Sequence, residues 1–489
     1  VKKPVIMKAH QTQLPETPLF LTISVTKFGV SVENVVATME IPSNHHGIFF
    51  PERKNWFVSL EAFFEEYIPT MTVIVMMNII IIQSTLFIFI TLLNKANVLA
   101  YLKLFLQKKI MLLVAKTLYG LENVLADEIK KIGGKGIEIR NRAISFEGSL
   151  ELVYTANIML RTATQILMPI KKFRINNADE LYKKGMQVDW SKIFDVKKTF
   201  SIKSTVNSFL FNHSNYPSLL LKDAIVDQFR KRTSRRPNVD SKFPDIKIDL
   251  HIENNFCTIS LDSSGDLLYK RGYRKSVSIA PINEVLAAGI ILLTKWNKET
   301  SFFDPMCGSG TFLIEAMMIA KNFPPNINRR YFGFTKWKNY DSKLYFKIRN
   351  KLKNQIIETK VQIYGSDNNQ KNIRICRENI NSIFNYNSIK IKNIDFFETT
   401  TERKSLVLFN PPYGERLRIE EDLFYEKIGN HLKHNFVGNE VWIFSQNNDE
   451  KKLRIGLKPS TKIKLKNGSI DCTLNKYEIF SGKNKERFN

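Results

Sequence analysis

From residue 111 onward, short apolar runs alternate with segments whose apolar residues recur every three or four positions. The first block predicts strand 112–117, a helix carrying Leu121, Leu125 and Ile129, strands 136–141 and 143–146, helix 150–163, and strand 165–173. This β-α-β-β-α-β order is typical of a ferredoxin-like domain. The order predicts a fold without indicating a function.

Residues 178–265 predict a second small α/β unit, with strand 199–208, helix 219–232 and a hairpin over 245–262. Further along the chain, strands are predicted to end at Asp304, Tyr364, Ile394, Phe409 and Ser445, with helices over 312–321 and 422–436. Asn467-Gly468 marks a terminal hairpin. The third block therefore predicts a doubly wound, Rossmann-like sheet with an antiparallel edge hairpin.

Residues 1–110 lack this patterning. Within them, residues 71–93 form an uncharged apolar run long enough to span a bilayer, and it is followed by Lys95, Lys103, Lys108 and Lys109. Two interpretations stay open: a membrane anchor, or a natural protein that begins at Met111 with translated flanking residues before it. The polar residues inside the run favour the second, so residues 1–110 are left unassigned as an N-terminal extension, and membrane contact is expected only if the run is native.

The formal net charge of +26 calls for a polyanionic partner, and nucleic acid is the default. The abundance of Asn and Ile leaves codon bias as another contribution. The chain has four cysteines and no CxxC pair. This pattern argues against a zinc site or a disulfide framework and suits a reducing cytosol.

Two basic segments are candidate RNA contacts. Five cations occupy seven residues at the end of the predicted helix 219–232: Arg230, Lys231, Arg232, Arg235 and Arg236. Such a cluster can hold several phosphates, although cations also stabilise a helix C-terminus, so both interpretations stay open. The connector after Gly265 interleaves cations with tyrosines: Lys270, Arg271 and Arg274 with Tyr269 and Tyr273. That mixture is typical of single-stranded nucleic-acid binding.

Candidate ligand-binding residues follow the predicted strands. Asp304 is followed by the turn Gly308-Ser309-Gly310, where glycines allow close backbone approach and the next helix offers free N–H groups. The turn matches neither the dinucleotide fingerprint nor a Walker loop. Asp367 and Asp395 follow the next two predicted strands. An acid at the end of the second strand is where a ribose diol is held.

The apolar strand ending at Phe409 runs into Asn410-Pro411-Pro412-Tyr413. Because two prolines fix φ and remove donors, the chain must leave the sheet there. The strand end then presents an amide, free carbonyls and an aromatic ring at the edge where α/β sheets bind ligands.

These motifs, in this order, resemble those of S-adenosylmethionine-dependent amino-methyltransferases. The segments 281–288, 413–416 and 235–240 narrow the resemblance to bacterial THUMP-domain methyltransferases, with the 23S rRNA guanine-N2 methyltransferases most similar. The resemblance covers residue 111 to about residue 483. It implies a ferredoxin-like domain at 111–173, a THUMP RNA-binding domain at 174–268 and a class I methyltransferase domain at 269–489. Some relatives carry a second methyltransferase domain, whose activity is expected to be absent here because the chain stops.

The resemblance also implies residue roles. Asp304, Gly308, Ser309 and Gly310 are expected to hold the methionine part of the cofactor, Asp367 its ribose, and Asp395 to lie near its adenine. Asn410 Oδ1 and the Pro411 carbonyl are expected to accept hydrogen bonds from the two N–H groups of the substrate amine, and Tyr413 is expected to stack on the base. RNA contacts are expected from the two basic segments and from Arg416. Because the sulfonium supplies the electrophile, no metal is expected.

The expected function is methylation of a guanine N2 in 23S rRNA or its large-subunit precursor, in the cytoplasm. Alternatives that share the Asn-Pro-Pro-Tyr chemistry are a tRNA guanine-N2, a DNA adenine-N6 or a protein glutamine methyltransferase. The basic α/β modules favour RNA. An RNA-binding assembly factor with an inactive fold is the non-enzymatic alternative, and the intact motifs argue against it.

Overall fold

The computed structural model describes residues 110–276, 281–401, 404–412, 421–446 and 455–481, together with five short strands before residue 40. The chain divides into two compact units, Val1–Lys103 and Leu104–Asn489. The first unit contributes strands β1 Lys8–Ala9, β2 Leu19–Thr22, β3 Thr26–Lys27, β4 Val30–Ser31 and β5 Val36–Met39. The apolar run 71–93 lies outside the described residues. Among the helices that are described, none has the length and apolar character needed to cross a membrane.

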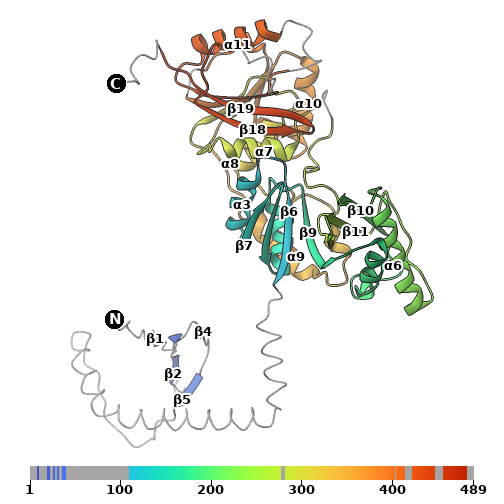
Figure 1. Cartoon of the computed structure of the whole chain (residues 1–489). Helices are drawn as coiled ribbons and strands as arrows, with labels where there is room; N and C mark the ends of the chain where they lie inside the picture. The colour runs from blue at the N-terminus through green and yellow to red at the C-terminus, as the bar shows by residue number, and fades with distance from the viewer. Residues whose placement is uncertain are drawn as a thin grey trace, which may run out of the picture. The chain divides into compact units, whose positions relative to one another are not determined.

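The second unit begins with the predicted β-α-β-β-α-β block. Its elements are β6 Met111–Lys116, α3 Glu122–Lys131, β7 Lys135–Arg140, β8 Ala143–Gly148, α4 Leu150–Met159 and β9 Gln165–Arg174. The next block comprises α5 Ala178–Met186, η1 Trp190–Lys192, β10 Phe200–Asn207, α6 Tyr216–Thr233, β11 Ile246–Glu253 and β12 Phe256–Asp262. The predicted order of elements is confirmed. Because β12 pairs with β9, the two blocks share one sheet of order β10-β11-β12-β9-β6-β8-β7 (Figure 1).

A second seven-stranded sheet follows. The first elements of this part of the chain are α7 Glu284–Leu293, β13 Ser301–Asp304, α8 Thr311–Ala320, η2 Gly333–Lys336, α9 Ser342–Lys353, β14 Ile363–Asp367 and α10 Gln370–Asn381. The elements that follow are η3 Tyr386–Ser388, β15 Lys390–Asn393, η4 Phe396–Glu398, β16 Ser405–Phe409, α11 Glu421–Asn435, β17 Glu440–Gln446, β18 Thr461–Asn467 and β19 Ile470–Glu478. The strand order is β15-β14-β13-β16-β17-β19-β18, and within this sheet β19 runs opposite to the other six strands. The predicted doubly wound sheet with an antiparallel edge is confirmed.

Strand β16 lies in the middle of this sheet, and all five of its residues are buried. Leu406 and Leu408 belong to the core formed with α7 and α8, whereas Val407 and Phe409 belong to the core formed with α11. Successive side chains of a strand point to opposite faces. An uninterrupted apolar run is therefore what a strand covered on both faces requires.

The segment between α8 and β14 packs against the first sheet rather than the second. Phe334 and Tyr345 lie in the hydrophobic core of the first two blocks, and α9 packs against α4. Figure 1 shows α9 beside β6 and β9 of the first sheet. The rings of Phe334 and Tyr154 are 4.5 Å apart, and Asp341 N donates to the Tyr154 hydroxyl at 3.0 Å. The sequence pattern did not predict this packing, because periodicity identifies an amphipathic helix without indicating which sheet it covers.

Candidate active site

Three strand ends meet at the carboxyl edge of the second sheet. Strand β13 pairs in parallel with both β14 and β16, so Asp304 and Asp367, which end their strands, and Asn410, which follows β16, belong to neighbouring strands. The chain order reverses between β13 and β16, and such a switch point is where open α/β sheets bind ligands. The Gly308 N–H donates to Asp367 Oδ2 at 2.9 Å, which joins the glycine turn to the second strand end.

The turn before α8 requires glycine at Gly310 and leaves space at Gly308. Both have positive φ, 82° and 52°. A Cβ on Gly310 would lie 2.6 Å from Cys376 Sγ, whereas a Cβ on Gly308 would meet no atom within 4 Å. Helix α8 starts directly after the turn, and its first N–H groups have no partner within the helix. The turn therefore suits a ligand that lies against the backbone at Gly308.

Ser309 and Asp304 are both buried within this turn. Asp304 Oδ1 accepts a hydrogen bond from the Met306 N–H at 3.1 Å. Burial, together with a smaller contribution from the charge of Asp367, raises the pKa of the Asp304 carboxyl well above its ordinary value. Asp304 thus holds the turn, and its direct contact with a cofactor stays a prediction.

Asp367 is largely buried and is held by two further hydrogen bonds. Its Oδ1 accepts from the Asn369 N–H at 2.9 Å and from Asn372 Nδ2 at 3.0 Å. An ionised carboxylate has about four acceptor positions, so one remains for a ligand hydroxyl. Asp395, after β15, accepts from the Phe397 N–H at 2.9 Å and from Asn368 Nδ2 at 2.8 Å.

Asn410 directly follows β16 and presents its side-chain amide at the edge of the sheet. Its Oδ1 is buried, and no residue that the structure describes donates a hydrogen bond to it. A buried acceptor left unpaired costs about 1–3 kcal/mol, so this atom is suited to a donor from a ligand. Pro411 is buried beside it. Tyr413 and Arg416 lie outside the described residues, and their roles stay predictions.

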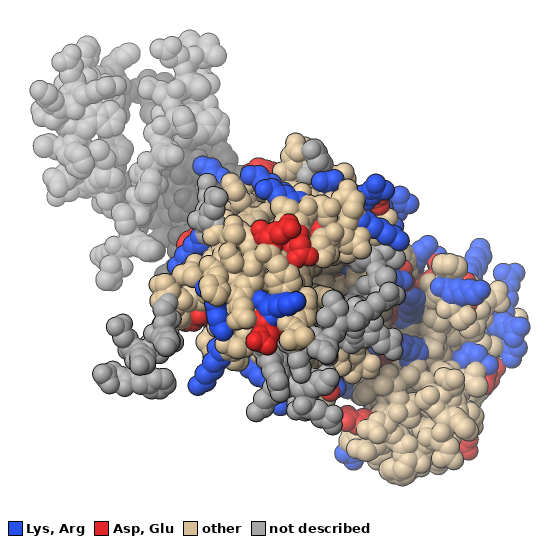
Figure 2. All heavy atoms as spheres, turned by 90° about the horizontal axis from the view of Figure 1, so that it is seen from above, with Lys and Arg blue, Asp and Glu red and all other residues tan. Residues whose placement is uncertain are grey.

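The five cations at the end of α6 are all exposed. Arg230 pairs with Asp227 and Arg232 with Asp189, yet their side chains remain 53% and 46% exposed. Figure 2 shows Lys and Arg side chains scattered over the face seen from above, most of which is formed by uncharged residues. Contact of Arg230, Lys231, Arg232, Arg235 and Arg236 with RNA stays a prediction that their exposure permits.

The connector residues require a correction. The Arg271 side chain is fully buried, and its Nε donates to Glu315 Oε1 at 2.7 Å. Arg274 is 15% exposed, and its Nε donates to Glu284 Oε1 at 2.9 Å. The prediction that Arg271 contacts RNA is therefore wrong, because its guanidinium is fully buried. Contact of the partly exposed Arg274 with RNA stays a prediction.

The same correction applies to the stacking expected of Tyr273, which is buried and donates to Glu315 Oε1 at 3.1 Å. Lys270 is exposed and stays a candidate RNA contact. The local sequence could not distinguish solvated cations from buried ones, because the matching acids lie 10 and 44 residues further along the chain.

The side-chain amides of Asn372 and Asn379, which the sequence pattern did not indicate, hold the residues of the site in place. Asn379 of α10 is buried, donates to the Ser309 carbonyl at 3.1 Å and accepts from the Lys275 N–H at 2.9 Å. Asn372 holds Asp367, as described above. The available signal was an asparagine on the inward, otherwise apolar face of helix α10.

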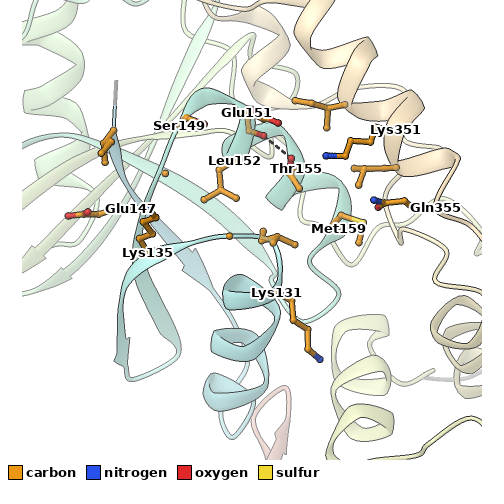
Figure 3. A pocket seen from close by; sticks show the side chains of 16 residues that line it. Lys131, Lys135, Glu147, Ser149, Glu151, Leu152, Thr155, Met159, Lys351 and Gln355 are labelled. Atoms are coloured by element: carbon orange, nitrogen blue, oxygen red, sulfur yellow. Dashed lines mark hydrogen bonds between the residues drawn. The ribbon is translucent and has the colours of Figure 1, made fainter. Parts of the chain in front are cut away.

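Two hollows lie outside this constellation. One of about 590 Å³ has Lys131, Lys135 and Lys351 at its rim and contains none of the motif residues (Figure 3). The other, of about 640 Å³, is lined by Lys270, Asn283 and the Asn467-Gly468 turn. Among the described residues, no group of three or more His, Cys, Asp or Glu could hold a metal ion.

A sheet of this strand order, with a glycine turn after its first strand and an acid after its second, defines the class I methyltransferase fold. Residues 271–476 match the RMKL-like methyltransferase domain, residues 176–262 the THUMP domain, and residues 112–167 the RlmL ferredoxin-like domain. A Synechocystis protein provisionally named an RNA methyltransferase is 35% identical over 365 residues, which cover 74% of this chain and 95% of that protein. The chain belongs to the THUMP-containing RMKL-like methyltransferase family.

Two further similarities carry information about ligands. The ribosomal RNA large subunit methyltransferase K/L of Buchnera aphidicola is 37% identical over 386 residues, which cover 76% of this chain and 55% of that protein. The chain thus spans about half the length of that relative. A protein provisionally named a methyltransferase, with a crystal structure in complex with SAH, is 29% identical with a TM-score of 0.69, covering 77% of this chain and all of that one.

Proposed function

We propose that the chain transfers a methyl group from S-adenosylmethionine to the exocyclic N2 amino group of a guanine in 23S rRNA or its large-subunit precursor. The observation that carries the proposal is the buried Oδ1 of Asn410, which accepts no hydrogen bond from any described residue and lies at the sheet edge that also holds the glycine turn. The names of the Synechocystis and Buchnera relatives support an RNA substrate, and the latter supports large-subunit RNA.

The residues at this edge fit the cofactor. The open space at Gly308 accommodates the methionine part, with Ser309 and Gly310 shaping the turn and Asp304 holding it. The remaining acceptor position of Asp367 suits a ribose hydroxyl, and Asp395 follows the neighbouring strand, on the adenine side. When bound, the cofactor supplies a methyl group on a positively charged sulfur. The complex of a structural relative with SAH supports this assignment.

The chain's own groups orient the substrate amine. A guanine amino group is a weak nucleophile, because its lone pair is delocalised into the ring. Asn410 Oδ1 and the Pro411 carbonyl oxygen accept hydrogen bonds from its two N–H groups. These bonds direct the nitrogen lone pair toward the methyl group. This contribution is preorganisation rather than acid–base catalysis. Tyr413 stacks on the guanine once this base has been extruded from the RNA stack, because an enzyme that modifies a base must first expose it.

RNA is delivered by the N-terminal modules of the second unit, with boundaries at 111–173 and 174–268 before the methyltransferase domain at 269–489. The exposed cations at the end of α6, together with Lys270 and Arg416, bind phosphates. The reaction takes place in the cytoplasm, where large-subunit RNA is made. A tRNA guanine or a DNA adenine would fit the same amide corner, and the similarity to the Buchnera protein favours large-subunit RNA.

The test is nucleoside mass spectrometry of large-subunit RNA from cells that lack the gene. We expect one N2-methylguanosine to disappear, to return with the wild-type gene, and to stay absent with Asn410→Ala. Asn212→Ala, in an exposed loop of the second block, is the matched control and should restore the nucleoside. An unchanged N2-methylguanosine content in the deletion strain would contradict the proposal.

A further inference from the structure

An exposed loop closes the start of the first sheet in the THUMP domain. The Phe200 N–H donates to the Asn238 carbonyl, and the Asp240 N–H donates to the Phe200 carbonyl, both at 3.0 Å. On the other side, the Ile246 N–H donates to the Thr199 carbonyl at 3.0 Å. Residues 241–245 therefore cross over the N-terminal end of β10.

Asp240 fixes the conformation of this loop. Its Oδ1 accepts hydrogen bonds from the Lys242 N–H at 2.8 Å and the Phe243 N–H at 2.9 Å. These two bonds lower the pKa of the Asp240 carboxyl. Phe243 is nevertheless 85% exposed, and Val239 beside the loop is 53% exposed. The loop thus holds a phenyl ring in water without packing it against the protein.

The topology gathers cations at the same end of the domain. Strands β10 and β11 are parallel, and α6 is the crossover between them, so the C-terminus of α6 lies near the start of β11. The exposed residues Arg235 and Arg236 lie between that terminus and the loop. Lys198 and Lys336 approach from two other segments, with Nζ atoms 3.7 and 3.5 Å from Asp245 Oδ1.

We infer that Phe243 is a base-stacking residue and that the RNA bound at this basic end presents an unpaired nucleotide to it. Cations that hold the backbone beside a ring that accepts a base are the combination used for single-stranded nucleic acid. A base inside a duplex has both faces covered by its neighbours, so the ring cannot stack on it. The inference rests on the proposed function only for the identity of the ligand as RNA.

The test measures binding of a labelled single-stranded RNA of about twelve nucleotides to the full chain by fluorescence anisotropy, with a duplex of the same sequence as second probe. Phe243→Ala should weaken single-strand binding roughly tenfold and leave duplex binding unchanged. Because stacking releases no counterions, the slope of log K against log salt should stay at the wild-type value. Arg235→Ala should instead reduce that slope by about one.

Phe209 offers a matched control. It is 81% exposed at the opposite end of β10, in a loop, residues 208–215, without Lys or Arg. Phe209→Ala should bind both probes like the wild type, and Phe243→Trp should retain binding. Equal losses in the two alanine variants, or wild-type binding by Phe243→Ala, would overturn the inference while leaving the proposed function intact. A wild-type chain that binds neither probe and methylates DNA or protein would overturn the proposed function itself.

Discussion

Breaking the buried ion pair between Arg271 and Glu315 should strongly lower the free energy of unfolding. Both side chains have zero exposure, and the Nε–Oε1 distance is 2.7 Å. Arg271 also donates to the Arg161 carbonyl at 2.7 Å, and Arg161 donates to the Phe323 carbonyl at 2.8 Å. The pair therefore connects the ferredoxin-like block to the methyltransferase sheet. Arg271→Met keeps most of the side-chain volume and leaves the Glu315 carboxyl without its nearest counter-charge.

The free energy of unfolding should fall by about 3 kcal/mol, the lower end for breaking a buried pair, because the Tyr273 hydroxyl and the charge of Arg161 stay close to Glu315. The loss should depend on pH. Burial raises the pKa of Glu315 above its ordinary value, although Arg271 and Arg161 oppose this. Without Arg271 this folded-state pKa rises further.

A carboxyl with a raised folded-state pKa binds more protons when folded, so its contribution to stability decreases as pH rises above the unfolded-state pKa of about 4.3. The deficit of Arg271→Met relative to the wild type should therefore be smallest near that pH and grow toward neutral pH. Urea denaturation, monitored by tryptophan fluorescence at each pH, measures the free energy of unfolding of the wild type and of Arg271→Met. Arg271→Met with Glu315→Gln should remove most of the pH dependence of the deficit.

The exposed pair of Arg140 and Glu138 provides the control, with an Nη2–Oε2 distance of 2.9 Å and side chains 59% and 66% exposed. Arg140→Met should leave the urea midpoint unchanged, because exposed pairs contribute little. Equal shifts in the two methionine variants would refute the argument. A deficit of Arg271→Met that stays constant between mildly acidic and neutral pH would do so as well.

Three further predictions concern the cofactor edge. Gly310→Ala should lower the melting temperature, because φ of 82° costs a non-glycine residue about 1–2 kcal/mol and its Cβ meets Cys376 Sγ; an unchanged melting curve would show that the turn tolerates a side chain. Gly308→Ala should lose affinity for S-adenosylhomocysteine in calorimetry while its melting temperature falls less than that of Gly310→Ala, and full affinity would contradict a cofactor at this backbone. Asp367→Asn should weaken the same affinity by roughly 10–100-fold, the loss of one hydrogen bond to a charged group, and binding equal to the wild type would remove Asp367 from the site.

The order of helices and strands could be predicted from the sequence, because the spacing of apolar residues and the length of each apolar run distinguish the two. The run that ends at Phe409 is apolar at every position, and the structure covers both its faces. What could not be predicted was which core the aromatic segment around Phe334 and Tyr345 would join. That choice depends on the shape of a surface formed by α4, more than 170 residues earlier in the chain.

The candidate site divides in the same way. Asp304, Asp367 and Asn410 could be placed together because parallel strands end at one edge. The structure adds the hydrogen bond from the Gly308 N–H to Asp367 Oδ2, which joins the glycine turn to the end of the second strand. Arg271 shows the limit of local sequence, since its burial depends on Glu315 in helix α8, 44 residues further along the chain.

The central claim is tested most directly by methyl transfer in vitro. The purified chain is incubated with labelled S-adenosylmethionine and large-subunit RNA from cells that lack the gene, and the labelled nucleoside is identified by mass spectrometry. The account predicts N2-methylguanosine, and a rate for Asn410→Ala at least roughly 10²-fold lower with unchanged cofactor affinity. Label in N6-methyladenine or in protein, or a wild-type rate for Asn410→Ala, would contradict it.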